Sequence, residues 1–268
     1  MIKRTKKISI FLLLLLIVSL FVTGCSPGGQ KVEETGEEPG EESAAPDDDK
    51  MVLRCVSLLE QTTRETEWLL YVIDIINNEI GDKIEINYLG GPDAIPGYEL
   101  GEALDKGVVD FVQLSFTWLQ DRYPEAQLAA LISDLSPEEQ RKLGVNEYFN
   151  EGLQQANTNI VFLGMCGLGY PITLYTNFPV DGIEDFKGKI CRISPLHQIA
   201  AESLGMETMT TSPGEMYSAV ERKIVDAYYW PAYISDYGLH EITQYRIHPG
   251  FGGSDAALLI NRNIWNEM

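Results

Sequence analysis

The feature that most constrains the fold is the alternation of short β-rich runs with amphipathic segments from Met51 to the end of the chain. Residues 52–58 form a β-rich run, and residues 62–80 then carry apolar side chains at helical spacing. Later strands are expected over 83–89, 108–115, 159–164, 172–176, 189–194 and 224–230, and helices over 98–106, 137–156, 196–204 and 214–223. This alternation predicts an α/β fold in which helices cover a mainly parallel sheet.

These strand and helix units fall into two clusters that separate near residues 164–171, so we expect two lobes. Residues 51–170 then form lobe I and residues 171–255 form lobe II. The last segment, residues 256–268, is expected to return toward lobe I.

Residues 1–24 are typical of a secretion signal peptide. Basic residues at positions 3–7 precede an uncharged apolar run over 8–22, which is shorter than the roughly 20 residues that a membrane-spanning helix needs. The stretch Val22-Thr23-Gly24-Cys25 resembles the bacterial lipobox, in which the cysteine thiol receives a diacylglyceryl group and becomes the first residue after cleavage. We therefore expect lipidation at Cys25, the alternative being an uncleaved membrane helix with an incidental cysteine.

The composition changes abruptly over residues 25–50, which are rich in Glu, Asp, Pro and Gly and have no aromatic residue. Such a segment buries too little apolar surface to fold, and its like charges keep it extended. It is expected to be a disordered linker between the lipid and the folded part. An acidic metal-binding tail is the alternative.

The net charge of −20 excludes one class of function. Nucleic-acid binding needs clustered Lys and Arg, so no nucleic-acid partner is expected. Besides Cys25, the cysteines are Cys55, Cys166 and Cys191, an odd number without close spacing. They are interpreted as small buried apolar residues and not as a disulfide framework.

The sequence has few features of an enzyme. It contains no Gly-x-Ser-x-Gly elbow, no phosphate-binding Gly-x-x-x-x-Gly-Lys loop and no His-Glu-x-x-His pair. The histidines His197, His240 and His248 are too few and too scattered for a usual zinc site. We expect no catalytic residue, no metal and no cofactor.

One charged residue stands in an apolar strand. Arg192 lies between Cys191 and Ile193, and alternation puts it on the opposite face from both neighbours. A buried guanidinium is costly without a partner. It is expected either to pair with an internal acid or to hold a ligand carboxylate through two parallel hydrogen bonds.

The segment 184–195 surrounds Arg192 and has the sequence Glu-Asp-Phe-Lys-Gly-Lys-Ile-Cys-Arg-Ile-Ser-Pro. It resembles the D-L-K-G-x-K-I-R-V-x-P signature of the solute-binding subunits of TRAP transporters, the DctP-type family. Further matches at the family's spacing are Gly107, Asp110, Leu163, Gly164, Pro179, Val180, Gly205, Pro213, Glu215, Tyr217, Val225, Asp226 and Pro231. The resemblance runs from about Val52 to the last residue.

This resemblance implies an extracytoplasmic receptor with the two-lobed architecture of periplasmic binding proteins, joined by hinge strands and a hinge helix. Such receptors close on a small organic acid and pass it to a membrane permease driven by an ion gradient. Arg192 stands at the family's carboxylate-binding arginine. The alternatives are an exported lipoprotein enzyme or a ligand sensor on the same scaffold. The acidic surface does not exclude an anionic ligand, because the Debye length is about 8 Å at about 0.15 M salt.

Two departures from the family pattern bear on the ligand. Tyr170 stands where many members carry a second Arg, and Trp230 replaces a frequent Asn. Losing a cation and gaining aromatic side chains favours a monocarboxylate, or an aromatic or aliphatic acid, over a compact dicarboxylate. Arg64 is a candidate for the missing charge, although it is also placed to bridge to Glu67. Further candidates for the cleft lining, each equally suited to the core, are Phe116, Trp118 and Tyr229.

Residues 263–268 resemble the start of the family's long C-terminal helix, which is expected to be cut short here. The shortened helix is expected to leave part of lobe I uncovered and to reduce stability.

Overall fold

The computed structural model describes residues 50–166, 171–250 and 253–268. The chain divides into two units, Met1–Pro46 and Asp47–Met268, and every described residue belongs to the second. The predicted signal peptide, the lipidation site Cys25 and the linker up to position 49 therefore lie outside the described residues. Within those residues, no helix combines the length and the apolar character that crossing a membrane requires.

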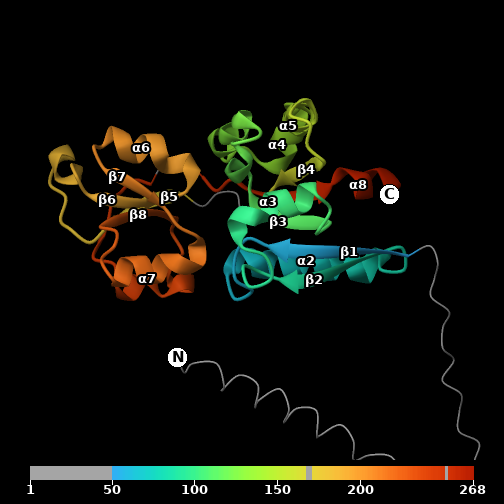
Figure 1. Cartoon of the computed structure of the whole chain (residues 1–268), viewed down its shortest axis with the longest axis horizontal. Helices are drawn as coiled ribbons and strands as arrows, with labels where there is room; N and C mark the ends of the chain where they lie inside the picture. The colour runs from blue at the N-terminus through green and yellow to red at the C-terminus, as the bar shows by residue number, and fades with distance from the viewer. Residues whose placement is uncertain (1–49, 167–170, 251–252) are drawn as a thin grey trace, which may run out of the picture. The chain divides into compact units, whose positions relative to one another are not determined.

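The first sheet has five strands in the order β2-β1-β3-β10-β4 (Figure 1). Its central strands β1 and β3 run parallel to each other, and β2 is parallel to β1. Strand β10 is antiparallel to both β3 and β4. The strand bounds are β1 Met51–Ser57, β2 Ile84–Gly90, β3 Phe111–Ser115, β4 Ile160–Met165 and β10 Ala256–Asn261.

Helices pack on both faces of this sheet, because its strands alternate two sets of apolar side chains. Leu53, Phe111 and Ile260 form one core with Leu69 and Ile73 of α2. The neighbouring side chains, which point the other way, form a second core with α3 and α5. The helices and 3-10 turns are α2 Arg64–Ile80, α3 Gly97–Asp105, η1 Phe116–Leu119, η2 Pro124–Ile132, α4 Pro137–Lys142, α5 Val145–Gln155 and α8 Arg262–Glu267.

The second sheet also has five strands, in the order β7-β6-β8-β5-β9. Strand β6 is parallel to β7 and β8, whereas β5 is antiparallel to β8 and β9. Helices α6 and α7 lie on opposite sides of it (Figure 1). The bounds are β5 Ile172–Thr176, η3 Ile183–Phe186, β6 Ile190–Ile193, η4 Pro195–His197, α6 Gln198–Ser203, β7 Glu207–Thr210, η5 Pro213–Glu215, α7 Met216–Glu221, β8 Ala227–Pro231, η6 Ile234–Tyr237, η7 Leu239–Glu241 and β9 Tyr245–Arg246.

The α/β class and the two sheets agree with the sequence prediction, but two details differ. Both sheets are mixed and not mainly parallel, because β5 and β10 follow chain segments that arrive from the other sheet and pair antiparallel. The helix expected over 137–156 is two helices, since Gly144 has a left-handed backbone with φ 76° and ends the first. Strands β7, β9 and β10 have no counterpart in the predicted strand pattern.

Two of the motif residues named above, Asp110 and Asp226, have structural roles. Asp110 accepts hydrogen bonds from the backbone and side-chain nitrogens of Arg54, each at 2.8 Å, and ties the start of β3 to β1. Burial raises the pKa of Asp110, but the hydrogen bonds from Arg54 outweigh it and hold this pKa below its usual value. Asp226 accepts from the backbone nitrogen of Ile190 at 2.9 Å and fixes the start of β6.

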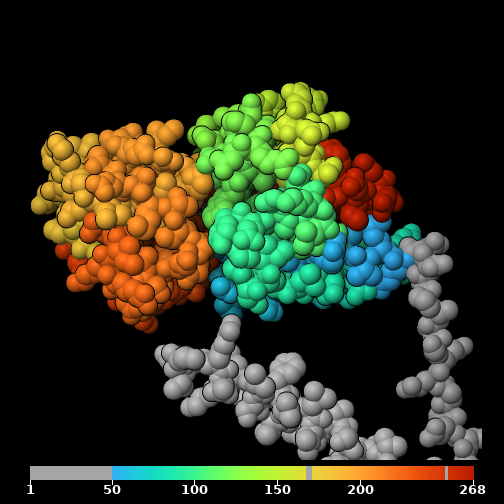
Figure 2. All heavy atoms as spheres, in the orientation of Figure 1, coloured from blue at the N-terminus to red at the C-terminus, as the bar shows by residue number. Residues whose placement is uncertain are grey.

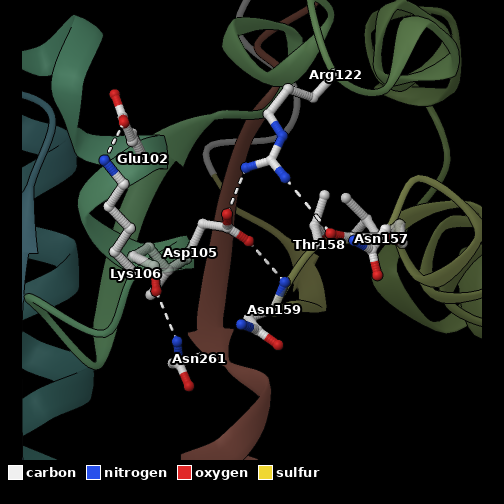
Figure 3. A network of polar contacts seen from close by, with 10 residues as sticks. Glu102, Asp105, Lys106, Arg122, Asn157, Thr158, Asn159 and Asn261 are labelled. Carbon is white, nitrogen blue, oxygen red and sulfur yellow. Dashed lines mark hydrogen bonds and ion pairs between the residues drawn. The ribbon is translucent and has the colours of Figure 1, made fainter.

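A polar network fastens the C-terminal end of α3 (Figure 3). Asp105 pairs with Arg122 and accepts the backbone N–H of Asn159 just before β4 at 2.6 Å. Asn261 donates to the carbonyl of Leu104 at 2.7 Å, which joins the end of β10 to the same helix. Beyond this network, α8 lies at the surface, where Trp265 is exposed (Figure 2).

Candidate functional site

A pocket lies where parallel strands of both sheets reach their carboxyl ends. It is bordered by residues that end or follow β1 and β3 of the first sheet and β6 and β8 of the second. Ligands of open α/β sheets commonly bind outside these strand ends. The lining residues used below are Glu65, Gln113, Trp118, Arg192, Ser194, His197, Tyr229, Trp230 and Asp255.

The pocket is small. It offers about 90 Å³ to the centres of water molecules. One water needs roughly 10–15 Å³ on this measure, so the space suits about six to nine waters or one small organic molecule.

Arg192 on β6 supplies the pocket's buried cation. Its side chain is 1 % exposed, and it makes no ion pair with any acid of the described residues. Its Nε donates to Oγ1 of Thr211 at 3.3 Å, and its Nη2 donates to the carbonyl of Thr211 at 2.7 Å. Thr211 therefore pairs with the edge of the guanidinium formed by Nε and Nη2. The other edge, formed by the two terminal nitrogens, remains for a ligand.

Burial makes the charged form of Arg192 less favourable than it is in water. Burial lowers the pKa of its guanidinium to about 10, which still leaves it fully charged at neutral pH. Its Cζ lies 5.1 Å from the ring centre of Trp230, a favourable cation–π distance. A buried cation held by neutral partners alone is suited to an incoming anion.

Aromatic rings line the second sheet's side of the pocket. His197 stacks on Tyr229 with ring centres 4.8 Å apart and shares a 2.8 Å hydrogen bond with Oγ of Ser194. Burial, followed by the charge of Arg192, lowers the pKa of His197 to about 3, so the ring is neutral at pH 7. Trp230 is 8 % exposed, and its Nε1 has no hydrogen-bond partner among the described residues.

Two polar side chains border the pocket from the first sheet's side. Glu65 in the first turn of α2 is 8 % exposed, and Gln113 on β3 is 4 % exposed. The amide nitrogen of Gln113 donates to the backbone carbonyl of Glu65 at 3.0 Å. Burial raises the pKa of Glu65 to about 7. Glu65 is therefore only partly ionised near neutral pH.

The remaining acid of the pocket already has partners. Asp255 accepts from Oγ of Ser115 at 2.7 Å and from the backbone nitrogen of Thr117 at 2.9 Å. It fixes the end of β3. The described residues contain no group of three or more His, Cys, Asp or Glu side chains arranged to hold a metal ion.

The model of the family described as bacterial extracellular solute-binding protein, family 7 (DctP), matches residues 70–268. The chain belongs to this family. The curated relatives include the monocarboxylate 2-oxoacid-binding periplasmic protein of Nostoc sp., which is 23 % identical over 193 residues. That match covers 69 % of this chain and 53 % of the relative, so the chain spans about half the length of that relative.

Solved receptors share the fold. A Bordetella pertussis extracytoplasmic solute receptor binding pyroglutamic acid matches with a TM-score of 0.70 at 18 % identity, over 81 % of this chain and 73 % of that one. A Haemophilus influenzae TRAP periplasmic solute-binding protein with bound L-gulonate matches with a TM-score of 0.67 at 20 % identity, over 82 % of this chain and 73 % of that one. At these identities the likeness establishes the two-lobed fold of the family 7 protein.

The structure brings four of the predicted site residues to one pocket: Arg192, Trp118, Tyr229 and Trp230. Phe116 is fully buried and packs against Phe149 and Phe162 in the core, so it is not among the lining residues. Tyr170 lies outside the described residues.

Arg64 borders a neighbouring pocket and not the one that Arg192 lines. Its guanidinium is 3.5 Å from a carboxylate oxygen of Asp236 and lies 5.6 Å from the ring centre of Tyr233. It does not bridge to Glu67, the alternative partner that the sequence suggests.

Sequence reasoning missed Glu65, Gln113 and His197 as pocket residues of this family 7 protein. Glu65 is one of many acids, and its position in the first turn of a helix is ordinary for Glu. Gln113 offers a usable signal, because it is the single amide in the apolar strand over 111–115. His197 follows Arg192 by five positions, and only the turn at Pro195 brings it back to the pocket.

Proposed function

We propose that the chain is the extracytoplasmic solute receptor of a TRAP transporter and captures a small organic acid in the pocket lined by Arg192. The observation that carries the proposal is the guanidinium itself. It is buried, charged and held by Thr211 on one edge, and the described residues offer it no acid. A ligand carboxylate would supply the missing counter-charge.

Binding then proceeds through the edge of the fork that Thr211 leaves. A carboxylate accepts two parallel hydrogen bonds from the terminal nitrogens, and Trp230 packs against the guanidinium. Water expelled from the pocket strengthens this pair, because the local dielectric falls. The single buried arginine of the described residues and the aromatic wall favour a monocarboxylic acid, in keeping with the 2-oxoacid and pyroglutamic acid named for relatives.

A thermal-shift screen with calorimetry tests this function. Small organic acids should raise the melting temperature, whereas the matching amides should not, because amides lack the charge that Arg192 needs. Arg192→Lys should weaken binding by roughly 2 to 5 kcal/mol, since an ammonium cannot reproduce the bidentate fork. Arg246→Lys, an exposed arginine on β9, is the matched control and should bind as wild type does. Equal stabilisation by acids and amides, or an unchanged dissociation constant for Arg192→Lys, would contradict the proposal.

The remaining parts of the proposal concern location and partners. The signal peptide over 1–24 and the Cys25 lipid would hold the receptor outside the cell membrane, near a membrane permease that accepts the acid. Cys25→Ser should move the protein from the membrane fraction to the soluble fraction without altering ligand affinity. We propose binding without chemical conversion, so ligand recovered after incubation should be unchanged.

A further inference from the structure

We propose that Glu65 and Gln113 form a second recognition point, which selects organic acids that carry a hydrogen-bond donor in addition to the carboxylate. This inference rests on the proposed capture through Arg192 and names the ligand class. The ligands it favours are hydroxy acids and acids with a ring or chain N–H.

The first support is an unmatched pair of acceptors. Oε2 of Glu65 and Oε1 of Gln113 are both buried and have no hydrogen-bond partner among the described residues. Exchanging the amide oxygen and nitrogen of Gln113 would not remove this unpaired acceptor. Its nitrogen already donates to the backbone carbonyl of Glu65, which fixes the opposite oxygen as an acceptor. Buried acceptors without donors are costly, so a ligand donor here is favourable.

The second support is the segregation of donors and acceptors in the pocket. Among the pocket residues, Arg192 on β6 has two terminal nitrogens that Thr211 does not pair as an edge, and Trp230 on β8 has an indole N–H without a described partner. The acceptors without partners are on α2 and β3. Asp255 does not join them, since Ser115 and Thr117 satisfy it. A ligand that satisfies both sides needs acceptor atoms, such as those of a carboxylate, and at least one hydrogen-bond donor.

Glu65 and Arg192 do not satisfy each other directly. They form no ion pair, although both residues line the same pocket. A small molecule bound in this pocket can therefore lie between the two groups.

The surroundings of Glu65 make this recognition pH-dependent. After burial, its pKa is raised further by Asp236 on η6 and lowered by Arg64 on its own helix. Tyr237 on η6 and Cys166 after β4 also interact with its carboxylate. Burial keeps both of these groups neutral at pH 7, because it raises their pKa values. A ligand N–H or O–H donates best to the ionised carboxylate, so such ligands should bind more tightly at pH 8 than at pH 6.

The experiment compares acids that differ by one donor. Pyroglutamic acid is matched with 5-oxotetrahydrofuran-2-carboxylic acid, in which the ring N–H becomes an oxygen. 2-Hydroxyisovaleric acid is matched with 2-oxoisovaleric acid. In calorimetry at pH 8, we expect the donor-bearing member of at least one pair to bind roughly 10- to 100-fold more tightly, the effect of leaving a buried acceptor unpaired.

Two variants assign the preference to Glu65. Glu65→Met removes one of the two acceptors at similar volume and should reduce the preference within each pair. Glu65→Gln keeps a neutral acceptor and should retain part of the preference without its pH dependence. Glu67→Gln changes an exposed acid on the same helical turn and should have no effect.

The outcomes separate this inference from the proposed function. If acids bind through Arg192 but both members of every pair bind alike, the second recognition point is wrong and the receptor function stands. If Glu65→Met keeps the wild-type preference, Glu65 is not the acceptor and the inference is also wrong. If no acid of any pair binds, the proposed function and the inference fail together.

Discussion

Arg192→Met is expected to leave the unliganded protein about as stable as wild type while abolishing stabilisation by organic acids. A buried arginine with an internal acid partner would behave differently. Removing one member of a buried ion pair typically costs about 3–5 kcal/mol, because the other charge is left unpaired. The substitution therefore distinguishes a ligand-binding arginine from a structural one.

The magnitude follows from the contacts of Arg192. Lowering its pKa from 12.5 to about 10 corresponds to a cost of about 3 kcal/mol for keeping the charge buried, which methionine removes. Against this stand two hydrogen bonds to Thr211 and the cation–π contact with Trp230, together worth about 2–4 kcal/mol. Thr211 is half-buried, so water replaces part of what it loses. The free energy of unfolding should change by less than about 2 kcal/mol.

The assay is urea denaturation followed by tryptophan fluorescence, on protein stripped of ligand by unfolding and refolding. Arg54→Met is the matched control, because Arg54 pairs with the buried carboxylate of Asp110. Arg54 is half-exposed, so its loss should cost about 2–3 kcal/mol, less than a fully buried pair. If Arg192→Met loses 3 kcal/mol or more, or still gains stability from acids, the assignment of Arg192 to ligand binding is refuted.

Two further predictions concern pH. Burial lowers the pKa of His197 to about 3, so this residue should contribute a loss of about 1.4 kcal/mol per pH unit as pH falls below about 6.5, where only the unfolded imidazole binds a proton. Glu65, with its raised pKa, contributes in the opposite direction, so the test is the difference between two proteins. In urea denaturation from pH 7 to 5, His197→Phe, which keeps the stack on Tyr229, should gain stability relative to wild type as pH falls. Asp110→Asn should lower the free energy of unfolding by about 2 kcal/mol at pH 7. The folded-state pKa of Asp110 is below its unfolded-state pKa, so its ionised carboxylate stabilises the fold above the unfolded-state pKa, and this stabilisation is lost as pH falls through the folded-state pKa. The difference between variant and wild type should therefore narrow below pH 4, and a constant difference from pH 7 to 3 would contradict this role.

The sequence predicts most of the fold because local patterns determine most of it. The helix α2 and the strands β1, β2 and β5 follow from periodicity and turn residues within their own segments. The missed strands lack such a local signal. Strand β9 has two exposed residues, and β10 is a continuous apolar run that periodicity cannot distinguish from a buried helix. The antiparallel pairing of β5 and β10 depends on the path of the whole chain.

Some residues of the candidate site can likewise be predicted from the sequence, whereas others cannot. Arg192 is visible in the sequence, because a charge in an apolar strand breaks the local pattern. Glu65 and Gln113 gain their importance only when α2 packs beside β3 and buries both against each other. Phe116 illustrates the reverse case, since an aromatic residue after a strand suits a cleft, but here the rings of Phe149 and Phe162 enclose it.

The many acidic residues of the chain do not cancel the positive charge of Arg192 in the pocket. This predicts how salt changes the rates of ligand binding and release. Asp255 is held by Ser115 and Thr117, and Glu65 loses part of its charge through its raised pKa. The net charge of −20 therefore acts on an approaching acid only from outside, where salt screens it over about 8 Å at 0.15 M. Raising the salt concentration from 20 to 200 mM should speed association of an organic acid in stopped-flow fluorescence. The dissociation rate should hardly change, because the pair with Arg192 is shielded from solvent ions. A dissociation rate that rises steeply with salt would place the ligand at an exposed charge and not in this pocket.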